Sequence, residues 1–311
     1  MFCIFVAHQI AYILILQKDH EGNIVGRFES VAQASAETGI VLTNIAAAVR
    51  GRRGTAGGSV WEEANIGSLV RKRLFFDIET SPNIGMFWSA GWKQTIDYSN
   101  IIKERAIICI CYKWEDEKNV HYLTWDKNQN DKAMLEAFIP ISNEADEMVG
   151  HNGDKFDLAW IRTRCLFHRI PMFPKYLSID TLKIARSKFR FNSNRLNYIA
   201  QFLGLGQKIH TEFSLWKEIL LNNNEEAMTT MVKYCKEDVR LLERIYAELK
   251  NHIEPKQNYG MLYESNKQAC PECGGEDLKV VSTKTTPAGT LKRQYLCRGC
   301  GKHHHKTSRG G

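Results

Sequence analysis

The sequence predicts a mixed α/β domain, in which helices cover a central sheet, with a smaller module on each side of it. Residues 72–255 alternate strand-like and helical stretches, which is typical of a mixed sheet flanked by helices. Residues 17–66 hold two short helical stretches around a glycine turn, and residues 266–311 hold two pairs of cysteines. A chain of 311 residues is long enough for one domain of ordinary size plus such modules.

The distribution of charge along the chain indicates the kind of partner that the protein binds. The net charge is +7, yet residues 74–265 are balanced, with 25 Lys and Arg against 26 Asp and Glu. The surplus lies in the flanking segments, above all in residues 266–311, which carry nine basic against three acidic side chains. Basic flanks around a neutral centre suit a protein that binds a polyanion, although solubility alone would also explain them.

The first sixteen residues are apolar but do not predict a membrane anchor. The run is short and is interrupted by His8 and Gln9, and it lacks the basic start and small-residue cleavage site of a signal peptide. We expect its end to form the first strand. Nine cysteines, an odd number, argue against a secreted disulfide framework, so a cytoplasmic protein without membrane contact is expected.

The central elements follow from hydrophobic periodicity. Expected strands cover residues 74–78, 106–114, 120–125 and 147–151, and the second and third of these are expected to form a hairpin through residues 115–119. Expected helices cover residues 132–138, 156–168, 180–187, 193–203 and 225–250. The segment 255–260 is the predicted exit from the last helix.

The first strand of this domain carries two acidic side chains. A strand alternates its faces, so Asp77 and Glu79 point the same way while Phe76 and Ile78 point the other way. Two adjacent carboxylates repel each other, and burying them costs several kcal/mol unless a cation lies between them. A divalent cation bound between the carboxylates would offset that cost. The alternative is a strand end whose acidic side chains are solvated.

Two further acidic residues lie on predicted helices. Asp157 falls in the first turn after the segment 150–153, where a plain helix-terminus charge is the alternative explanation. Tyr234 and Asp238 are four residues apart and share one helix face. The apolar period of the helix predicts that Asp238 points toward the core. The alternative for Asp238 is a bond to an arginine at the edge of the apolar stripe.

Together the three motifs resemble a known superfamily. Phe-Asp-Ile-Glu-Thr at 76–80, Asn-x-x-x-Phe-Asp at 152–157 and Tyr-x-x-x-Asp at 234–238 are similar to the DEDD 3′→5′ exonucleases, which have a ribonuclease-H-like fold. The tyrosine marks the DEDDy branch; the histidine branch would have a histidine at Lys233. The resemblance covers residues 72–250 and is closest to the proofreading domain of family B DNA polymerases and its stand-alone bacterial and phage relatives.

The resemblance implies that the carboxylates hold two metal ions. Asp77 would bridge both ions. Glu79 and Asp238 would hold the ion that activates the attacking water, and Asp157 would support the second ion. Mg²⁺ or Mn²⁺ is expected because all of these ligands are oxygen atoms, and two such ions can clamp an in-line phosphoryl displacement.

The resemblance also implies contacts to substrate. Tyr234 would orient the attacking water, and Asn152, Phe156 and Thr80 would contact the terminal nucleotides. Asp180 is interpreted as a plain helix cap. His151 and His210 each stand alone in the sequence and are not expected to bind metal.

The segment 17–66 predicts a DNA-binding module. Helical stretches at 30–38 and 43–49 flank Gly39, which gives a helix-turn-helix pattern. With Gly26, Phe28, Gly51, Gly57, Gly58 and Trp61, the segment is similar to the nuclease-associated modular DNA-binding domain. That resemblance implies a second helix near the major groove and phosphate contacts, with candidate DNA-binding residues Thr43, Asn44, Arg50, Arg52 and Arg53. The alternative is a folded spacer without affinity for DNA.

The paired cysteines predict a structural zinc site. Cys270 and Cys273 form one C-x-x-C pair, and Cys297 and Cys300 form the other. The basic segment between the pairs is expected to form two strands, so residues 266–311 resemble a zinc ribbon; free thiols or a redox pair are the alternatives. Expected phosphate contacts are Lys292, Arg293, Lys302, Arg298 and Arg309, and the cluster His303–His305 is expected to be solvated.

The combined prediction is a metal-dependent 3′→5′ exonuclease whose partner is DNA with a free 3′ end. Three alternatives remain open from the sequence. They are a catalytically weak protein that binds DNA ends, an exoribonuclease on the same fold, and an endonuclease that cuts flaps or junctions. The catalytic motifs do not choose between the two sugars.

Overall fold

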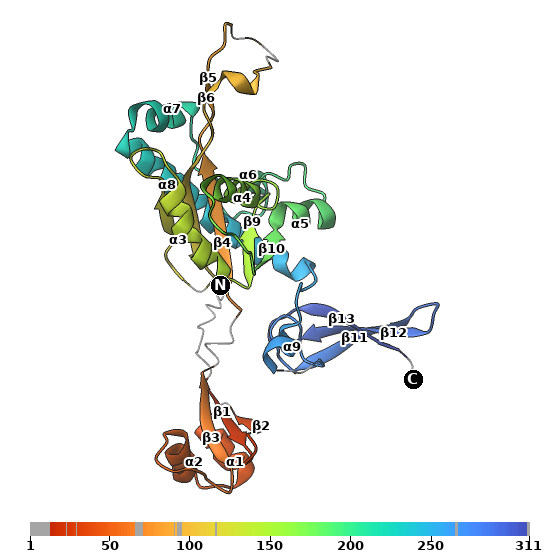
Figure 1. The fold of residues 1–311 in the computed structure, drawn as a ribbon. Helices are drawn as coiled ribbons and strands as arrows, with labels where there is room; N and C mark the ends of the chain where they lie inside the picture. The colour runs from red at the N-terminus through yellow and green to blue at the C-terminus, as the bar shows by residue number, and fades with distance from the viewer. Residues whose placement is uncertain are drawn as a thin grey trace. The chain divides into compact units, whose positions relative to one another are not determined.

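The chain forms two compact units, residues 1–70 and residues 71–311. The computed structural model describes residues 13–22, 24–28, 30–65, 71–89, 91, 95–115, 117–264 and 267–309 (Figure 1). Most of the apolar segment 1–16 lies outside these residues, and its end enters the first strand, β1 (Ile13–Lys18). Within the described chain, no helix has the length and apolar character needed to cross a membrane.

The N-terminal unit packs two short helices on a three-stranded antiparallel sheet. The strands β2 (Ile24–Phe28) and β3 (Val60–Asn65) lie on either side of β1. Helices α1 (Val31–Thr38) and α2 (Leu42–Val49) close a core that includes Ile15, Phe28, Ala34, Ile45 and Trp61. The sequence predicts the two helices but only the first of these strands.

Local signals explain the two helices of this unit. Ser30 Oγ accepts the backbone N–H of Gln33 at 3.1 Å and so caps α1. Gly39 ends α1 at a φ of 71°, a left-handed conformation that glycine adopts without strain. Helix α2 begins without a side-chain cap, after Val41. Thr43 and Asn44 therefore lie inside the first turn of α2, as its second and third residues.

The second unit is built on a five-stranded mixed sheet in the order β10-β9-β4-β7-β8. Strands β4, β9 and β10 run parallel, and β7 and β8 are antiparallel to their neighbours. The strands are β4 (Arg73–Thr80), β7 (Ile107–Trp114), β8 (His121–Thr124), β9 (Glu147–Gly150) and β10 (Leu177–Asp180). The mixed sheet flanked by helices agrees with the predicted fold class.

Helices cover both faces of this sheet (Figure 1). Phe76 and Ile78 of β4 pack with α3 (Lys132–Asn143) and α4 (Asp157–His168). Phe75 points to the opposite face and packs against α8 (Glu225–Leu249). Because β4 is buried on both faces, it has the near-continuous apolar sequence of a central strand. The second face is completed by α5 (Thr181–Lys188), α6 (Leu196–Phe202) and α7 (Phe213–Asn222).

Several elements of the second unit were not predicted. Strand β10, apart from Asp180, and helix α7 lie in segments for which the sequence predicts neither helix nor strand. A two-stranded ribbon, formed by β5 (Ile84–Gly85) and β6 (Ile101–Lys103), also follows β4 and projects from the sheet (Figure 1). Helix α3 is longer than predicted and contains Pro140. Its last turns persist because Phe138 and Ile139 are buried in the core.

The C-terminal segment forms a three-stranded antiparallel sheet in the order β11-β12-β13. It comprises β11 (Leu278–Thr285), β12 (Thr290–Cys297) and β13 (His303–Arg309), and it follows a short helix, α9 (Tyr259–Glu264). Glu272, between the first two paired cysteines, forms an ion pair with Arg71. Lys302 Nζ donates to the carbonyl of Lys250. These contacts tie the C-terminal sheet to the rest of the unit.

Two expectations for this sheet were wrong. Strand β13 alternates its faces, so His304 is buried and stacks on Tyr295 at 5.6 Å, and the histidine cluster is not uniformly solvated. Lys302, expected to contact phosphate, is also buried because its ammonium group is held by the end of α8. Lys292, Arg293 and Arg298 remain exposed.

Candidate metal and nucleic-acid site

Three carboxylates from two distant segments meet on one face of the sheet. Asp77 and Glu79 lie on β4, and Asp238 lies on α8, which crosses that face. One oxygen atom of each carboxylate lies within 4.8 Å of the others. The strand geometry predicted that Asp77 and Glu79 share a face, and the helix periodicity predicted that Asp238 faces the core. This close approach is suited to a divalent cation with oxygen ligands.

Asp157 lies beside this cluster but outside that set of three. Strand β9 pairs with β4 only as far as Phe75. Further along β4, the backbone N–H of Ile78 donates to Asp157 Oδ1 at 3.1 Å. The carboxylate of Asp157 is buried at the first turn of α4, where the helix dipole favours an anion. A buried carboxylate in this position has both a structural partner and access to the acidic cluster.

The raised pKa values of the carboxylates indicate an excess of negative charge, which a bound cation would offset. Burial, followed by the charges of Asp157, Glu79 and Asp238, raises the pKa of Asp77 well above its ordinary value. Burial, followed by Cys109 and Asp238, raises the pKa of Glu79. Burial raises the pKa of Asp157 to about 7, although the hydrogen bond from Ile78 opposes that shift. Such shifts arise where negative charges are crowded without enough positive charge.

The structure adds a lysine that sequence analysis missed. Lys208 lies in the loop between α6 and α7, and its Nζ pairs with Asp238 Oδ2 at 2.5 Å. The same ammonium group lies 5.1 Å from the ring centroid of Tyr234. Burial lowers the pKa of Lys208, but the charge of Asp238, the hydrogen bond to it, and the neighbouring Tyr234 and Asp77 together outweigh burial and raise the pKa above the ordinary lysine value. In the sequence, this loop is marked by Gly204 and Gly206, which the structure places at positive φ. These glycines indicate a loop but do not indicate that Lys208 reaches Asp238.

The remaining polar atoms fit an ion bound by oxygen ligands. Asp238 Oδ1 is buried without a hydrogen-bond partner among the described residues. A buried carboxylate oxygen left in this way is costly. Tyr234 lies one turn before Asp238 on α8, and burial followed by the charge of Asp238 raises the pKa of Tyr234 to about 12. Its phenol therefore stays protonated at neutral pH and is able to donate a hydrogen bond.

A polar groove adjoins the cluster at Lys208. Its volume is about 640 Å³, and its other lining residues are His151, Asn152, Leu182, Arg186 and residues 192–197. Asn152 has a φ of 66°, and its N–H donates to Asp180 Oδ1 at 2.9 Å. Asp180 also caps α5, as predicted. His151 is held between Thr181 Oγ1 and the carbonyl of Asn194, at 2.9 Å from each.

The other two expected substrate residues are in less open positions. Phe156 is partly buried against the core beneath α3 and α4. Thr80 ends β4, and its carbonyl accepts the indole N–H of Trp216 at 3.1 Å. Of the three residues expected to contact nucleotides, Asn152 alone lines the groove described above.

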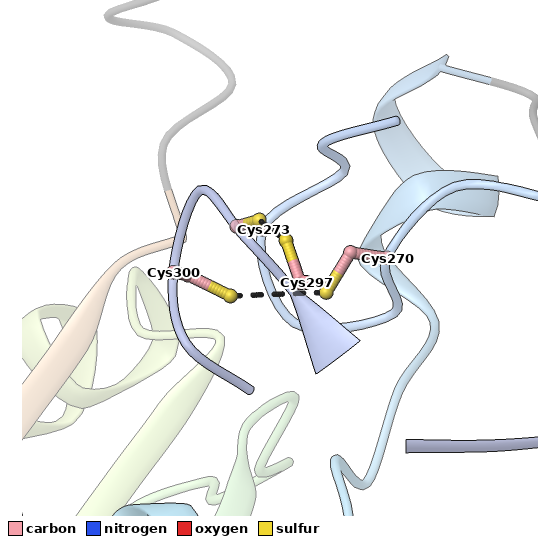
Figure 2. Close-up of side chains that lie close together, drawn as sticks. All are labelled: Cys270, Cys273, Cys297 and Cys300. Atoms are coloured by element: carbon pink, nitrogen blue, oxygen red, sulfur yellow. Dashed lines mark hydrogen bonds between the residues drawn. The ribbon is translucent and has the colours of Figure 1, made fainter. Parts of the chain in front are cut away.

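The four paired cysteines converge at the end of β12 (Figure 2). Cys270 Sγ lies 3.8 Å from Cys300 Sγ, and Cys273 Sγ lies 3.6 Å from Cys297 Sγ. The two C-x-x-C segments form turns of the same kind. In the first, Gly274 donates its N–H to the carbonyl of Cys270, and in the second, Gly301 donates its N–H to the carbonyl of Cys297. All four sulfur atoms lie within 4.8 Å of one another, so the cluster is able to hold a metal ion.

In the N-terminal unit, the candidate DNA-binding residues lie at the surface. Arg50, Arg52 and Arg53 are exposed after α2, and Arg53 Nη1 donates to Asn44 Oδ1 at 2.7 Å. Thr43 is exposed on the same helix. Asn44 is therefore partly occupied by an internal contact.

Comparison with known proteins bears on the second unit. Residues 100–250 match the family described as "RNase_H superfamily". The matched range includes Asp157 and Asp238 but begins after β4, so it leaves out Asp77 and Glu79. Among curated proteins, none matches the sequence.

One solved structure similar to this chain is a family B DNA polymerase from the hyperthermophilic archaeon Pyrobaculum calidifontis. It is 15% identical, with a TM-score of 0.46, and the similarity covers 62% of this chain and 27% of the polymerase. Residues 100–250 are thus similar to the RNase H superfamily, and the chain spans about a quarter of the length of the polymerase.

Proposed function

We propose that the chain is a metal-dependent 3′→5′ exonuclease that hydrolyses phosphodiester bonds of DNA with two metal ions. The observation that carries the proposal is the convergence of Asp77, Glu79 and Asp238 within 4.8 Å, with Asp157 beside them. The match to the RNase H superfamily supports a nuclease in general. The order and spacing of the motifs support the DEDDy type.

The residues present fit a pair of Mg²⁺ or Mn²⁺ ions. Asp77, Glu79 and Asp238 would hold the ions, with Asp157 as a further ligand, and Asp238 Oδ1 has no competing partner among the described residues. Bound ions would supply an activated water and stabilise charge on the attacking and leaving oxygens. Tyr234, which stays protonated, would donate a hydrogen bond that orients the attacking water. Lys208 would keep Asp238 in position.

The adjoining groove would hold the end of the strand. Asn152 and Lys208 line the groove where it meets the cluster, and Arg186 lines it as well. Three cations, with Arg195 as the third, and several side-chain amides suit a sugar-phosphate backbone, because phosphate accepts hydrogen bonds from both. Thr80, at the end of β4, and Phe156, at the start of α4, would support the terminal nucleotide.

The two smaller parts would bind the rest of the nucleic acid. Exposed Arg50, Arg52 and Arg53 follow α2, which suits phosphate contacts to duplex DNA. We further propose that Cys270, Cys273, Cys297 and Cys300 hold one structural Zn²⁺. Four thiolates satisfy its tetrahedral preference and fill the site.

The test is a cleavage assay on a 5′-labelled single-stranded DNA and a matched RNA, each with a free or blocked 3′ end. Mg²⁺, Mn²⁺ and EDTA are compared for the wild type, Asp77→Asn and a control, Glu248→Gln, whose carboxylate lies on the exposed face of α8. We expect a ladder that shortens from the free 3′ end of DNA, needs the metal and disappears only in Asp77→Asn.

The other outcomes are equally specific. Equal cleavage of the blocked substrate would indicate an endonuclease, and cleavage of RNA alone would indicate an exoribonuclease. No cleavage of any substrate, with DNA binding intact, would replace the proposal with a protein that binds DNA ends.

A further inference from the structure

A second cluster of side chains able to bind a metal lies beside the carboxylates, on the same face of the sheet. Cys109 and Cys111 lie on β7, and Cys235 lies on α8. Their three sulfur atoms are within 4.8 Å of one another, and all three residues are fully buried. None of these cysteines has a role in the proposed reaction.

The sheet register explains why the thiols lie beside the acids. On β4, Asp77 pairs with Cys111 and Glu79 pairs with Cys109, so all four side chains share the face that α8 covers. Helix α8 brings Cys235 onto the same face, three residues before Asp238. The thiol cluster and the carboxylate cluster are therefore neighbouring sets on one surface.

Asp77, a member of the carboxylate cluster, also contacts the thiol cluster through Cys235. Cys235 Sγ lies 3.6 Å from Asp77 Oδ2 and 3.5 Å from the Asp77 carbonyl. Cys111 Sγ lies 3.8 Å from the carbonyl of Val232. Two of the three thiols thus approach oxygen acceptors and not only apolar core atoms. A carboxylate oxygen and three sulfur atoms are the four donors that a tetrahedral Zn²⁺ site requires.

We propose that Cys109, Cys111 and Cys235, with Asp77 as the fourth ligand, form a second metal site that takes Zn²⁺. Sulfur ligands favour zinc over the Mg²⁺ or Mn²⁺ expected at the neighbouring carboxylates. Binding converts the three thiols to thiolates, and their protons pass to solvent. The ion would enter past Asp77 and Glu79, which are partly exposed.

The shared ligand makes the two sites antagonistic, a consequence that rests on the proposed function. An ion on the thiolates would hold Asp77 away from the catalytic ions, so zinc would inhibit the nuclease. By linkage, Mg²⁺ or Mn²⁺ on Asp77 would weaken zinc binding by the same factor. The thiol cluster would then act as an inhibitory site that is built into the catalytic sheet.

The first experiment measures binding and does not depend on activity. The full chain, with zinc already on the four C-terminal cysteines, is titrated with Cd²⁺ under a non-thiol reductant, and the sulfur-to-cadmium absorption band is followed. We expect one additional ion per chain in the wild type. Its affinity should fall about 10- to 100-fold or more in Cys109→Ala and in Cys235→Ala. The control Cys165→Ala removes a buried thiol outside the cluster and should bind as the wild type does.

A second measurement needs no variant and so covers the case in which the substitutions unfold the chain. Pulsed alkylation of the wild type, read by mass spectrometry, should show that Zn²⁺ slows modification of Cys109, Cys111 and Cys235 but not of Cys165. Absence of the additional cadmium ion, or equal alkylation with and without zinc, would overturn the site.

The inhibitory role is then tested on its own. Zinc added to the Mg²⁺-dependent assay should inhibit the wild type at a concentration about 10- to 100-fold lower than it inhibits Cys235→Ala, each relative to its own uninhibited rate. Equal inhibition would remove the inhibitory role. A chain that binds the extra cadmium ion but cleaves nothing would refute the proposed nuclease and leave the thiol site standing.

Discussion

At the scale of single residues, the acidic cluster contains more negative than positive charge. Four carboxylates gather around β4, and Lys208 is the ammonium group that pairs with one of them, Asp238. Because these carboxylates are buried, solvent screens their charge only weakly. The cluster is therefore expected to bind divalent cations. Without them, the stability of the protein should depend on pH and on the presence of Lys208.

The pH dependence follows from Asp157. Its pKa in the folded protein, about 7, lies above the ordinary aspartate value because the carboxylate is buried. Its contribution to stability is thus fully present below the ordinary pKa and is lost as the pH rises through about 7. We expect the melting temperature of the metal-free protein to fall across this window and to fall less in Asp157→Asn. Thermal melts at several pH values in EDTA measure this, and an equally steep fall in the variant would contradict it.

Lys208 should matter most when the metal is absent. Lys208→Met leaves the buried carboxylate of Asp238 without its counter-ion. Because the lysine side chain is 29% exposed, the loss is set at about 1–3 kcal/mol of unfolding free energy and not at the value for a fully buried pair. Urea unfolding in EDTA measures it. With saturating Mg²⁺ the difference should shrink, because bound cations replace the lost charge.

The matched control for that variant is Lys233→Met, which alters an exposed lysine on α8. It should change stability little in either buffer. A loss for Lys208→Met that Mg²⁺ does not reduce would indicate that Lys208 contributes through packing and not through its charge.

The sequence was sufficient for the acidic residues and insufficient for the lysine. Strand alternation places Asp77 with Glu79, and helix periodicity turns Asp238 toward the core, so local rules carry this information. Lys208 reaches Asp238 from a loop, and no local period records where a loop travels. The thiols were also overlooked, because their meeting depends on the register between β4 and β7.

At the scale of elements, helix α8 carries the largest share of the site. It supplies Tyr234, Cys235 and Asp238, and it buries a long apolar stripe against β4 and β7. Its length and strong period made it predictable. Strand β10, by contrast, is four residues long, follows a proline-rich loop and is stabilised by parallel pairing with β9. Such a strand depends on tertiary pairing more than on its own sequence.

The start of α8 is fixed by a single cap. Asn224 Oδ1 accepts the N–H groups of Glu226 at 2.9 Å and Ala227 at 3.1 Å. Asn224→Ala should lower the unfolding free energy by about 1 kcal/mol. Chemical denaturation measures this, with Asn251→Ala, at an exposed asparagine beyond α8, as the control. Equal stability of the two variants would show that the packing of α8, and not its cap, determines where it begins.

At the scale of the whole molecule, the two units have separate cores and can be tested separately. A chain of residues 71–311 should keep the metal-dependent activity on a short single strand. It should bind duplex DNA more weakly and with a smaller salt dependence, because Arg50, Arg52 and Arg53 are gone. Nuclease assays and binding at several salt concentrations measure both effects. Unchanged duplex affinity would indicate that the N-terminal unit is a spacer.

The distance along the chain between the parts of the site also determines when it forms during synthesis. Asp77 and Cys235, which touch in the folded protein, are 158 positions apart. A ribosome adding about 5–20 residues per second would need roughly 8–30 s to make that stretch. The N-terminal unit needs contacts only within its own first 70 residues. A growing chain would therefore acquire its first folded unit well before the carboxylate and thiol clusters of the second unit could assemble.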